Sequence, residues 1–183
     1  MIPWESAHTG VETCPSWAPT GTREIHINGD VMMAVWRFWQ TTGDATNPWL
    51  GAVGYPLLQQ IATFWVSKLL LDNPTACLPS FPCPSQPPPD AYTSPLHLLD
   101  VIPPDEYADH VNDSAFTNSG AKLGLAAAAS AATLLGVPAN VSAPWANATA
   151  RIVVPFNASA PGITGGMHPE YAGYANETIK QAD

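Results

Sequence analysis

Apolar residues recur along this 183-residue chain mainly at helical spacing. After Asp30 they fall at i, i+3, i+4, i+7 and i+8, which is the period of one helix face: Val31, Ala34, Val35, Phe38 and Trp39. Asn28 is a suitable N-cap for this helix, and Gly43 is a suitable stop. The pattern therefore predicts a first amphipathic helix between these two residues.

Two further helices are predicted downstream. The helical spacing of apolar residues returns over residues 55–69, and another helix is expected over 115–135, ended by Gly136 and Pro138. The many alanines of this third helix allow a neighbouring helix to approach closely. The tryptophans at helical spacing are expected in the core: Trp36, Trp39 and Trp65.

Strands are poorly supported. The one candidate covers residues 151–156, and Pro155 weakens it. Ten of the twenty prolines lie between Pro74 and Pro104, which predicts a Pro-rich surface insertion over residues 73–96 rather than a helix or central strand. The predicted fold class is all-α. Because three helices are too few to enclose a site, we expect them to be consecutive members of a larger helical barrel.

Charge narrows the possible partners. Six basic and fifteen acidic residues give a net charge of −9, and only 11% of residues are charged. A nucleic-acid reader needs basic residues against phosphates, and an anionic membrane repels an acidic surface. We therefore expect neither nucleic-acid binding nor membrane insertion. The most apolar stretch, residues 121–139, is alanine-dominated and too weakly apolar to span a bilayer.

Glycosylation signals bear on the compartment. Five Asn-x-Ser/Thr triplets occur, four of them after residue 139: Asn112, Asn140, Asn147, Asn157 and Asn176. Cys77 and Cys83 lie six residues apart, and either a local disulfide or two free thiols fits that spacing. No signal peptide is visible. A secreted, vacuolar or lysosomal location is preferred, with a cytoplasmic one as the alternative and chance occurrence of the triplets left open.

Acids, amides and aromatics cluster in four loops. The clusters cover residues 3–15, 24–30, 103–118 and 168–183. Sugar sites combine these residue types, because aromatic rings cover the apolar face of a sugar while amides and carboxylates bind its hydroxyls. Two simpler interpretations stay open: Glu24 and Asp30 can complement a helix dipole, and Asp105-Glu106 can be a solvated turn.

Other chemistries lack their motifs. The five histidines show no metal-ligand spacing, so we expect no metal and no cofactor. Neither a glycine-rich phosphate loop nor the sequence around a nucleophilic serine occurs.

The order of four motifs resembles glycoside hydrolase family 65. They are Pro-Trp-Glu-Ser-Ala-x-x-Gly-x-Glu-x-Cys-Pro, Glu-Ile-His-Ile-Asn-Gly-Asp, Pro-Asp-Glu-Tyr with Asn-x-Ser-x-x-Thr-Asn, and Lys-Gln-Ala-Asp. The family contains acid trehalases, a glucosidase acting on glucosylgalactosyl-hydroxylysine, and disaccharide phosphorylases. The resemblance implies an (α/α)6 catalytic barrel, of which residues 1–183 form the middle portion. The partners it implies are a small α-glucoside or glycosylated hydroxylysine, and the missing barrel helices.

The same resemblance implies roles for particular residues. Glu12 matches the general acid, with a pKa raised by burial beside Trp4 or Trp17, and Glu24 is the rival for this role. Glu170 is the candidate general base. The expected substrate-binding residues are Trp4, Glu5, Glu24, Asp105, Glu106, Tyr107, Lys180 and Gln181. Of these, Lys180 and Gln181 match residues that bind the glucose hydroxyls, and residues 105–107 are expected near the leaving sugar.

Three functions follow as hypotheses. The preferred one is an inverting α-glucoside hydrolase with two carboxyl groups on opposite sides of the sugar. The second is a disaccharide phosphorylase, and the third a secreted glycoprotein module without catalysis. Hydrolysis predicts the two acids in one shared cavity, whereas a non-catalytic module predicts solvated acids far apart. The choice between trehalose and glucosylgalactosyl-hydroxylysine stays open.

Overall fold

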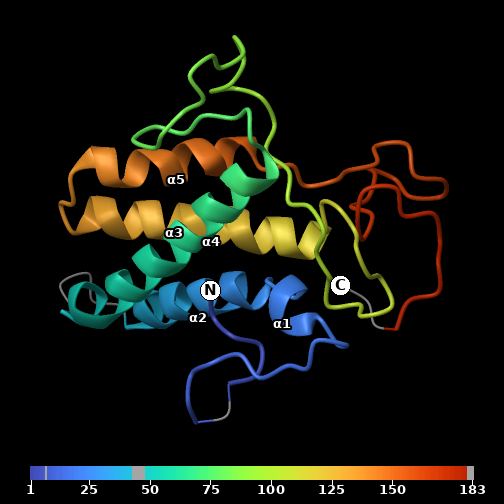
Figure 1. Ribbon diagram of the computed structural model, residues 1–183, viewed down its shortest axis with the longest axis horizontal. Coiled ribbons are helices and arrows are strands. Elements are labelled where there is room, and N and C mark those ends of the chain that lie inside the picture. The colour runs from blue at the N-terminus through green and yellow to red at the C-terminus, as the bar shows by residue number, and fades with distance from the viewer. Residues whose placement is uncertain (7, 43–47, 181–183) are drawn as a thin grey trace.

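The computed structural model describes residues 1–6, 8–42 and 48–180, and this part of the chain is all-α (Figure 1). Its elements are α1 (Thr20–Arg23), α2 (Ile27–Thr41), the π-helical turn η1 (Leu50–Gly54), α3 (Tyr55–Asp72), α4 (Ala115–Leu134) and α5 (Ala139–Arg151). The three predicted helices correspond to α2, α3 and α4 and are confirmed. Gly43, the predicted stop of the first helix, lies outside the described residues.

The start of α2 differs from the prediction. His26, not Asn28, holds the N-cap position. Asn28 is buried in the first turn, where its Nδ2 donates to the Ile25 carbonyl and its Oδ1 accepts the Ile2 N–H, both at 2.8 Å. The asparagine therefore ties the N-terminal segment to α2 instead of capping the helix.

A tight turn joins α4 to α5, and the two helices pack side by side (Figure 1). Gly136 has φ +68° and the Val137 N–H donates to the Ala132 carbonyl, an arrangement that ends a helix. Helix α5 was not predicted, since Pro144 interrupts its sequence pattern. The strand prediction over 151–156 is wrong: Arg151 ends α5, and Ile152 makes one isolated bridge to Leu96.

Helices α2 and α4 cross at a contact made by small residues. A Cβ added at Gly29 would lie 2.8 Å from the Gly120 backbone carbon, and one added at Gly124 would lie 2.7 Å from the Met32 sulfur. Helix α3 packs against the same core, where Trp65 is fully buried as expected. Trp36 and Trp39 are only partly buried and pack against the edge of that core.

The Pro-rich residues 73–96 form an irregular loop that arches over α3 and α5 (Figure 1). Cys77 and Cys83 are joined by a disulfide within it, so the structure selects the bonded alternative. Arg151 fastens the loop to the end of α5: its guanidinium donates to the carbonyls of Cys77, Ala91 and Ser94 at 2.8–3.0 Å.

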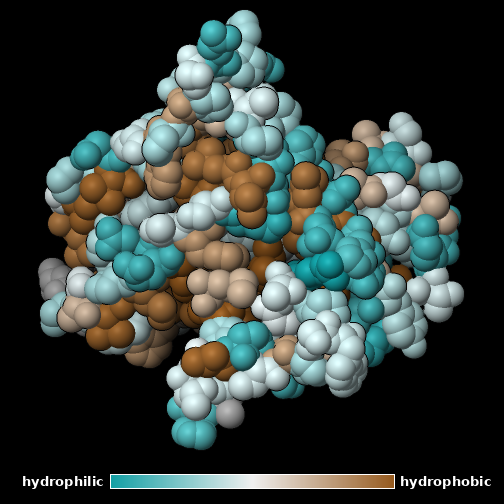
Figure 2. Space-filling model, viewed as in Figure 1, coloured by the Kyte–Doolittle hydropathy of each residue, from teal (hydrophilic) through white to brown (hydrophobic). Residues whose placement is uncertain are grey.

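The surface divides into two regions in the view of Figure 2. Apolar side chains gather over the helices, whereas the loops beyond them are mostly hydrophilic. Among the described helices, none combines the length and the apolar character that crossing a membrane requires. The hydrophilic loops contain the residues that the sequence singles out for chemistry.

Candidate active site

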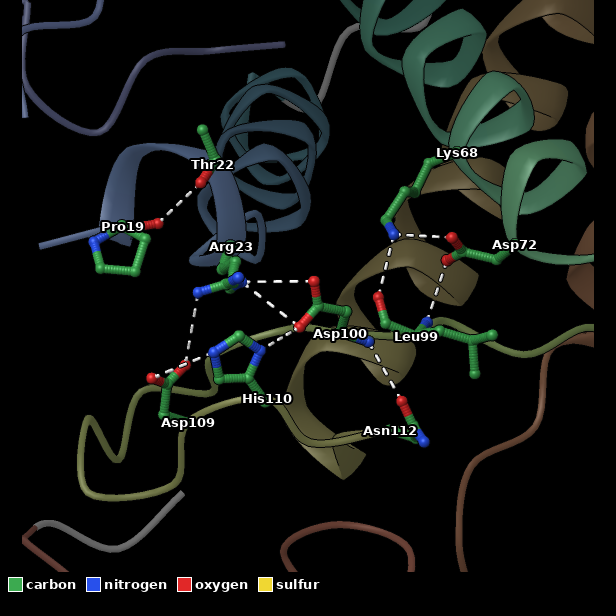
Figure 3. Close-up of polar contacts among 10 residues, drawn as sticks. All are labelled: Pro19, Thr22, Arg23, Lys68, Asp72, Leu99, Asp100, Asp109, His110 and Asn112. Atoms are coloured by element: carbon green, nitrogen blue, oxygen red, sulfur yellow. Dashed lines mark hydrogen bonds and ion pairs between the residues drawn. The ribbon is translucent and has the colours of Figure 1, made fainter. Parts of the chain in front are cut away.

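A short hairpin-like loop brings the third predicted cluster to the junction of α1 and α2. Val101 and Val111 exchange backbone hydrogen bonds of 2.9 and 3.1 Å, and the Ile102 N–H donates to the Arg23 carbonyl. Figure 3 shows how side chains fix this loop: Arg23 lies between Asp100 and Asp109, and His110 contacts both carboxylates. The loop that carries residues 105–107 is therefore held firmly beside α1.

On the other side of this loop, the Lys68 ammonium contacts the Asp72 carboxylate and donates to the Leu99 carbonyl (Figure 3). The Leu99 N–H donates to Asp72 in return at 2.9 Å. These contacts anchor the loop to the end of α3, so two helices position it.

Glu24, Glu106 and Lys180 form a cluster of ionisable groups at this junction. Glu24 follows α1 and is only 2% exposed, whereas the side chains of Glu106 and Lys180 are 44% and 42% exposed. The Lys180 ammonium binds the Glu106 carboxylate, and its backbone N–H donates to Asp105 Oδ1 at 2.7 Å. The C-terminal segment thus returns to the α1–α2 junction, as Figure 1 shows.

The cluster changes the acidity of Glu24. The pKa of its carboxyl is raised to about 7, chiefly by burial and also by the nearby Glu106 charge, while Lys180 offsets part of the rise. The hydrogen bond that Lys180 donates to Glu106 raises the pKa of the Lys180 ammonium in turn. Glu24 is therefore a carboxyl that holds its proton close to neutral pH, which is the property required of a general acid.

Glu12 has the opposite environment. Its carboxylate accepts backbone N–H groups from Trp4, Glu5, Thr13 and Cys14 at 2.6–3.3 Å. These bonds lower its pKa to about 2, those from Cys14 contributing most. Trp17 is 84% exposed and buries nothing. The expected rise of the Glu12 pKa is therefore wrong, and the hydrogen bonds of its carboxylate organise the N-terminal loop.

Glu170 lies where two cavities adjoin. One cavity of about 520 Å³ lies between α2, α4 and residues 167–179, and its wall includes Glu170, Asp30, Phe116 and Tyr174. A smaller hollow of about 70 Å³ is lined by Glu170 together with Asp105 and Tyr107. Glu12 lines neither cavity.

The structure brings together most of the predicted site. Glu24, Asp105, Glu106 and Lys180 meet at the α1–α2 junction, and Tyr107 and Glu170 share the smaller hollow with Asp105. Trp4 and Glu5 belong with Glu12 to the N-terminal loop, although the Trp4 ring reaches His26 at 5.5 Å. Gln181 lies outside the described residues.

The sequence analysis did not predict that His26 belongs to the site or that Asp30 contacts it. His26 Nδ1 lies 3.2 Å from Asp30 Oδ2, and Asp30 also faces the larger cavity. The i, i+4 spacing of these two residues on a helix start was an available signal. In the described part of the chain, no group of three or more His, Cys, Asp or Glu side chains is arranged to hold a metal ion.

Comparison with known proteins places these residues in context. The sequence profile of the glycosyl hydrolase family 65 central catalytic domain matches residues 1–78. The chain is 36% identical to the protein-glucosylgalactosylhydroxylysine glucosidase of Dictyostelium discoideum and 36% identical to that of Gallus gallus, in each case over 100% of this chain and 22% of the relative. It is 31% identical to the kojibiose hydrolase of Flavobacterium johnsoniae, over 100% of this chain and 23% of that protein. The chain thus spans about a fifth of the length of these curated relatives.

Proposed function

Because this chain belongs to glycoside hydrolase family 65, we propose that the protein carrying it hydrolyses α-glucosidic bonds and releases glucose. We further propose that residues 1–183 are part of one (α/α)6 catalytic domain, completed by helices from the rest of the protein. The observation that carries the proposal is the acidic cluster at the α1–α2 junction: exposed Glu106 bound to Lys180 beside a buried Glu24.

The proposed proton donor is Glu12, the residue that matches the family's general acid, and Glu24 is the alternative. A general acid must reach the glycosidic oxygen and hold a proton. Glu12 is partly exposed but has a pKa lowered to about 2, whereas Glu24 has a pKa raised to about 7 but is buried. Residues 105–107, with Glu106 bound to Lys180, are proposed to lie beside the leaving sugar.

Glu170 is the proposed base. It shares the smaller hollow with Asp105 and Tyr107, next to Glu106 in the chain. In the reaction, Glu170 removes a proton from water as the oxygen attacks the anomeric carbon. The bond from that carbon to the leaving oxygen breaks, and the proton of the general acid, Glu12 or Glu24, passes to that oxygen. Attack from the face opposite the leaving group inverts the anomeric configuration.

The remaining site residues are proposed to bind the sugar. Tyr107 and Tyr174 line the smaller hollow with Glu170 and can cover an apolar ring face. Lys180 and Gln181 keep their proposed contact with glucose hydroxyls, and Trp4 and Glu5 a place at the cleft edge. The relatives named above favour a glucosyl disaccharide unit, as in glucosylgalactosyl-hydroxylysine or kojibiose, over trehalose.

The test uses the full-length protein that carries this chain. It is offered kojibiose, glucosylgalactosyl-hydroxylysine and trehalose, each with and without inorganic phosphate, and products are followed by proton NMR. We expect β-glucose as the first product without phosphate. Glucose 1-phosphate formed only with phosphate would establish the phosphorylase alternative, and no turnover of any of the three would contradict the proposal.

We also propose that the protein passes through the secretory pathway. The disulfide between Cys77 and Cys83 suits an oxidising compartment. Asn140, Asn157 and Asn176 each begin an Asn-x-Ser/Thr triplet and are exposed, as glycan attachment requires.

A further inference from the structure

The Glu12 side chain covers a glycine of α1. Gly21 is buried within this helix, and a Cβ atom added to it would lie 2.3 Å from Glu12 Cδ, 2.7 Å from Cγ and 2.7 Å from Oε1. Carbon atoms pack at about 3.5–4.0 Å. The Glu12 carboxyl group therefore occupies the volume that a side chain at position 21 would need.

The backbone of α1 does not require glycine at this position. Gly21 lies within the helix Thr20–Arg23 and has no positive φ, unlike Gly10 of the neighbouring loop, whose φ is +74°. Glycine is also a poorer helix former than alanine. The missing side chain is thus explained by the space that Glu12 occupies and not by the backbone conformation.

Hydrogen bonds fix the same carboxylate within the N-terminal loop. Its Oε2 accepts the Trp4 N–H at 2.6 Å, and its Oε1 accepts the N–H groups of Thr13 and Cys14 at 2.9 and 2.8 Å. A Cβ atom at position 21 would force the carboxyl group of Glu12 to move by about 1 Å or more to reach an ordinary contact. Such a movement would stretch these hydrogen bonds beyond their usual range of about 2.7–3.2 Å.

A second contact joins the N-terminal loop to α1. Thr20 Oγ1 donates to Cys14 Sγ at 3.2 Å, and the Glu24 N–H donates to the Thr20 carbonyl at 2.8 Å. The short helix thus contacts the loop that carries Glu12 and is followed directly by Glu24. Both candidate acids depend on its position.

We propose that Gly21 is a positioning residue, whose missing side chain leaves the space in which the Glu12 carboxyl group lies between the N-terminal loop and α1. The proposal rests on the proposed function for the role of Glu12 as the general acid. Gly21 is buried, so it acts through Glu12. Catalysis is sensitive to such positions, since a misplacement of about 1 Å can lower a rate about 10²-fold.

The experiment compares the Gly21→Ala variant of the full-length protein with the unsubstituted protein on two substrates, each protein at its own optimum pH. One substrate is kojibiose or glucosylgalactosyl-hydroxylysine, whichever is turned over faster, and its leaving oxygen needs a proton. The other is α-glucosyl fluoride, whose fluoride leaves without one. We expect the ratio of kcat on the O-glucoside to kcat on the fluoride to fall about 10²-fold in Gly21→Ala. A merely structural role would lower both activities in step, so an unchanged ratio would overturn the inference.

A double-mutant cycle separates this effect from a general loss of stability. Glu12→Ala removes the atoms that a Cβ atom at position 21 would meet. In the Glu12→Ala background, Gly21→Ala should therefore lower neither the midpoint of denaturant unfolding nor the ratio of the two activities any further. Equal losses of stability in both backgrounds would contradict the inference. If Gly21→Ala alone does not fold, a double variant that folds supports the inference, and one that does not fold contradicts it.

Two controls distinguish failure of the inference from failure of the proposed function. Gly51→Ala should leave the ratio unchanged, because its Cβ atom would lie 3.5 Å from Leu135 Cδ2, an ordinary contact. Glu12→Gln should lower kcat on the O-glucoside while hydrolysis of the fluoride persists. If it does not, Glu12 is not the acid and the inference fails with that assignment. A lowered ratio in Glu12→Gln together with an unchanged ratio in Gly21→Ala contradicts the inference alone.

Discussion

Glu12 and Glu24 show how the surroundings of a carboxyl group decide its chemistry. Both lie in acidic, aromatic-rich loops, and both were candidates for the acid. Backbone N–H groups surround Glu12 and stabilise its charge, whereas Glu24 is enclosed by side chains and has an oxygen without a hydrogen bond among the described residues. The local sequence shows which residues are acidic, but it does not predict which carboxylate will accept hydrogen bonds from the backbone N–H groups of a turn.

The first prediction concerns Glu12→Gln. The folded-state pKa of Glu12 is lowered from 4.5 to about 2, so its stabilising effect is complete above pH 4.5 and lost as pH falls through 2. The variant should melt a few degrees below the unsubstituted protein at pH 7, with the difference disappearing toward pH 2. A thermal-melting series over pH checks this point, and a difference that persists at pH 2 would contradict it.

The motif order predicted which residues lie together more fully than it predicted their surroundings. The structure gathers Glu24, Glu106 and Lys180 at the α1–α2 junction and places Glu170 where two cavities adjoin. The exposure of each carboxyl group could not be predicted from the sequence, because it depends on loops from distant parts of the chain. Lys180 reaches Glu106 across 74 positions, and such a contact leaves no local pattern.

At the scale of elements, the crossing of α2 and α4 positions the site. Gly29 lies in the first turn of α2, directly after Asn28, and its Cα lies against Gly120 of α4. The close approach keeps Phe116 beside His26. The many small residues of α4 predicted such a close approach, but only the structure shows that Gly29 is the position where a Cβ atom would not fit.

The second prediction tests this contact from both sides. Gly29→Ala should lower the free energy of unfolding by about 1–3 kcal/mol, since its Cβ would meet the Gly120 backbone at 2.8 Å and backbone cannot step aside. Gly120→Ala is the matched control, because its Cβ would lie 3.6 Å from the Gly29 Cα, an ordinary contact. It should be neutral or stabilise α4 by up to about 1 kcal/mol. Denaturant unfolding of the full-length variants measures both, and equal losses would contradict the account.

Helices were predicted where the apolar period is unbroken and missed where packing overrides it. Helices α2, α3 and α4 have long periodic runs. Helix α5 contains Pro144 and several Asn, Ser and Thr residues, all weak helix formers, and forms through its packing on α4. The N-cap of α2 was misplaced because Asn28 uses its amide to bind the N-terminal segment instead.

At the scale of the whole molecule, the acidic and aromatic loops gather at one end of the helices (Figure 1). This end contains the hairpin-like loop, the α1–α2 junction and the C-terminal segment. The Pro-rich loop with its disulfide lies over α3 and α5 instead, fastened by Arg151. The candidate catalytic end therefore lies apart from the Pro-rich loop, which is held by the disulfide and by the hydrogen bonds of Arg151.

The third prediction concerns the compartment. If the protein is secreted from its own host, Asn140 should carry a glycan, because it is exposed in the first turn of α5. Asn147 is the contrasting site, since its Oδ1 accepts a 2.8 Å hydrogen bond from Arg151, so we expect low occupancy there. Non-reducing peptide mass spectrometry would measure both together with the Cys77–Cys83 bond. Unmodified triplets and free thiols would indicate the cytoplasmic alternative.

The most direct test of the central claim compares two substrates in the Glu12→Gln and Glu24→Gln variants of the full-length protein. An O-glucoside needs a proton on its leaving oxygen, whereas the fluoride of α-glucosyl fluoride leaves without one. In the variant that lacks the general acid, we expect kcat on the O-glucoside to fall about 10²–10⁴-fold while hydrolysis of the fluoride largely persists. Glu170→Gln should lose both activities, because water activation is needed in each case. Unchanged activity of both the Glu12 and the Glu24 variants on the O-glucoside would contradict the account.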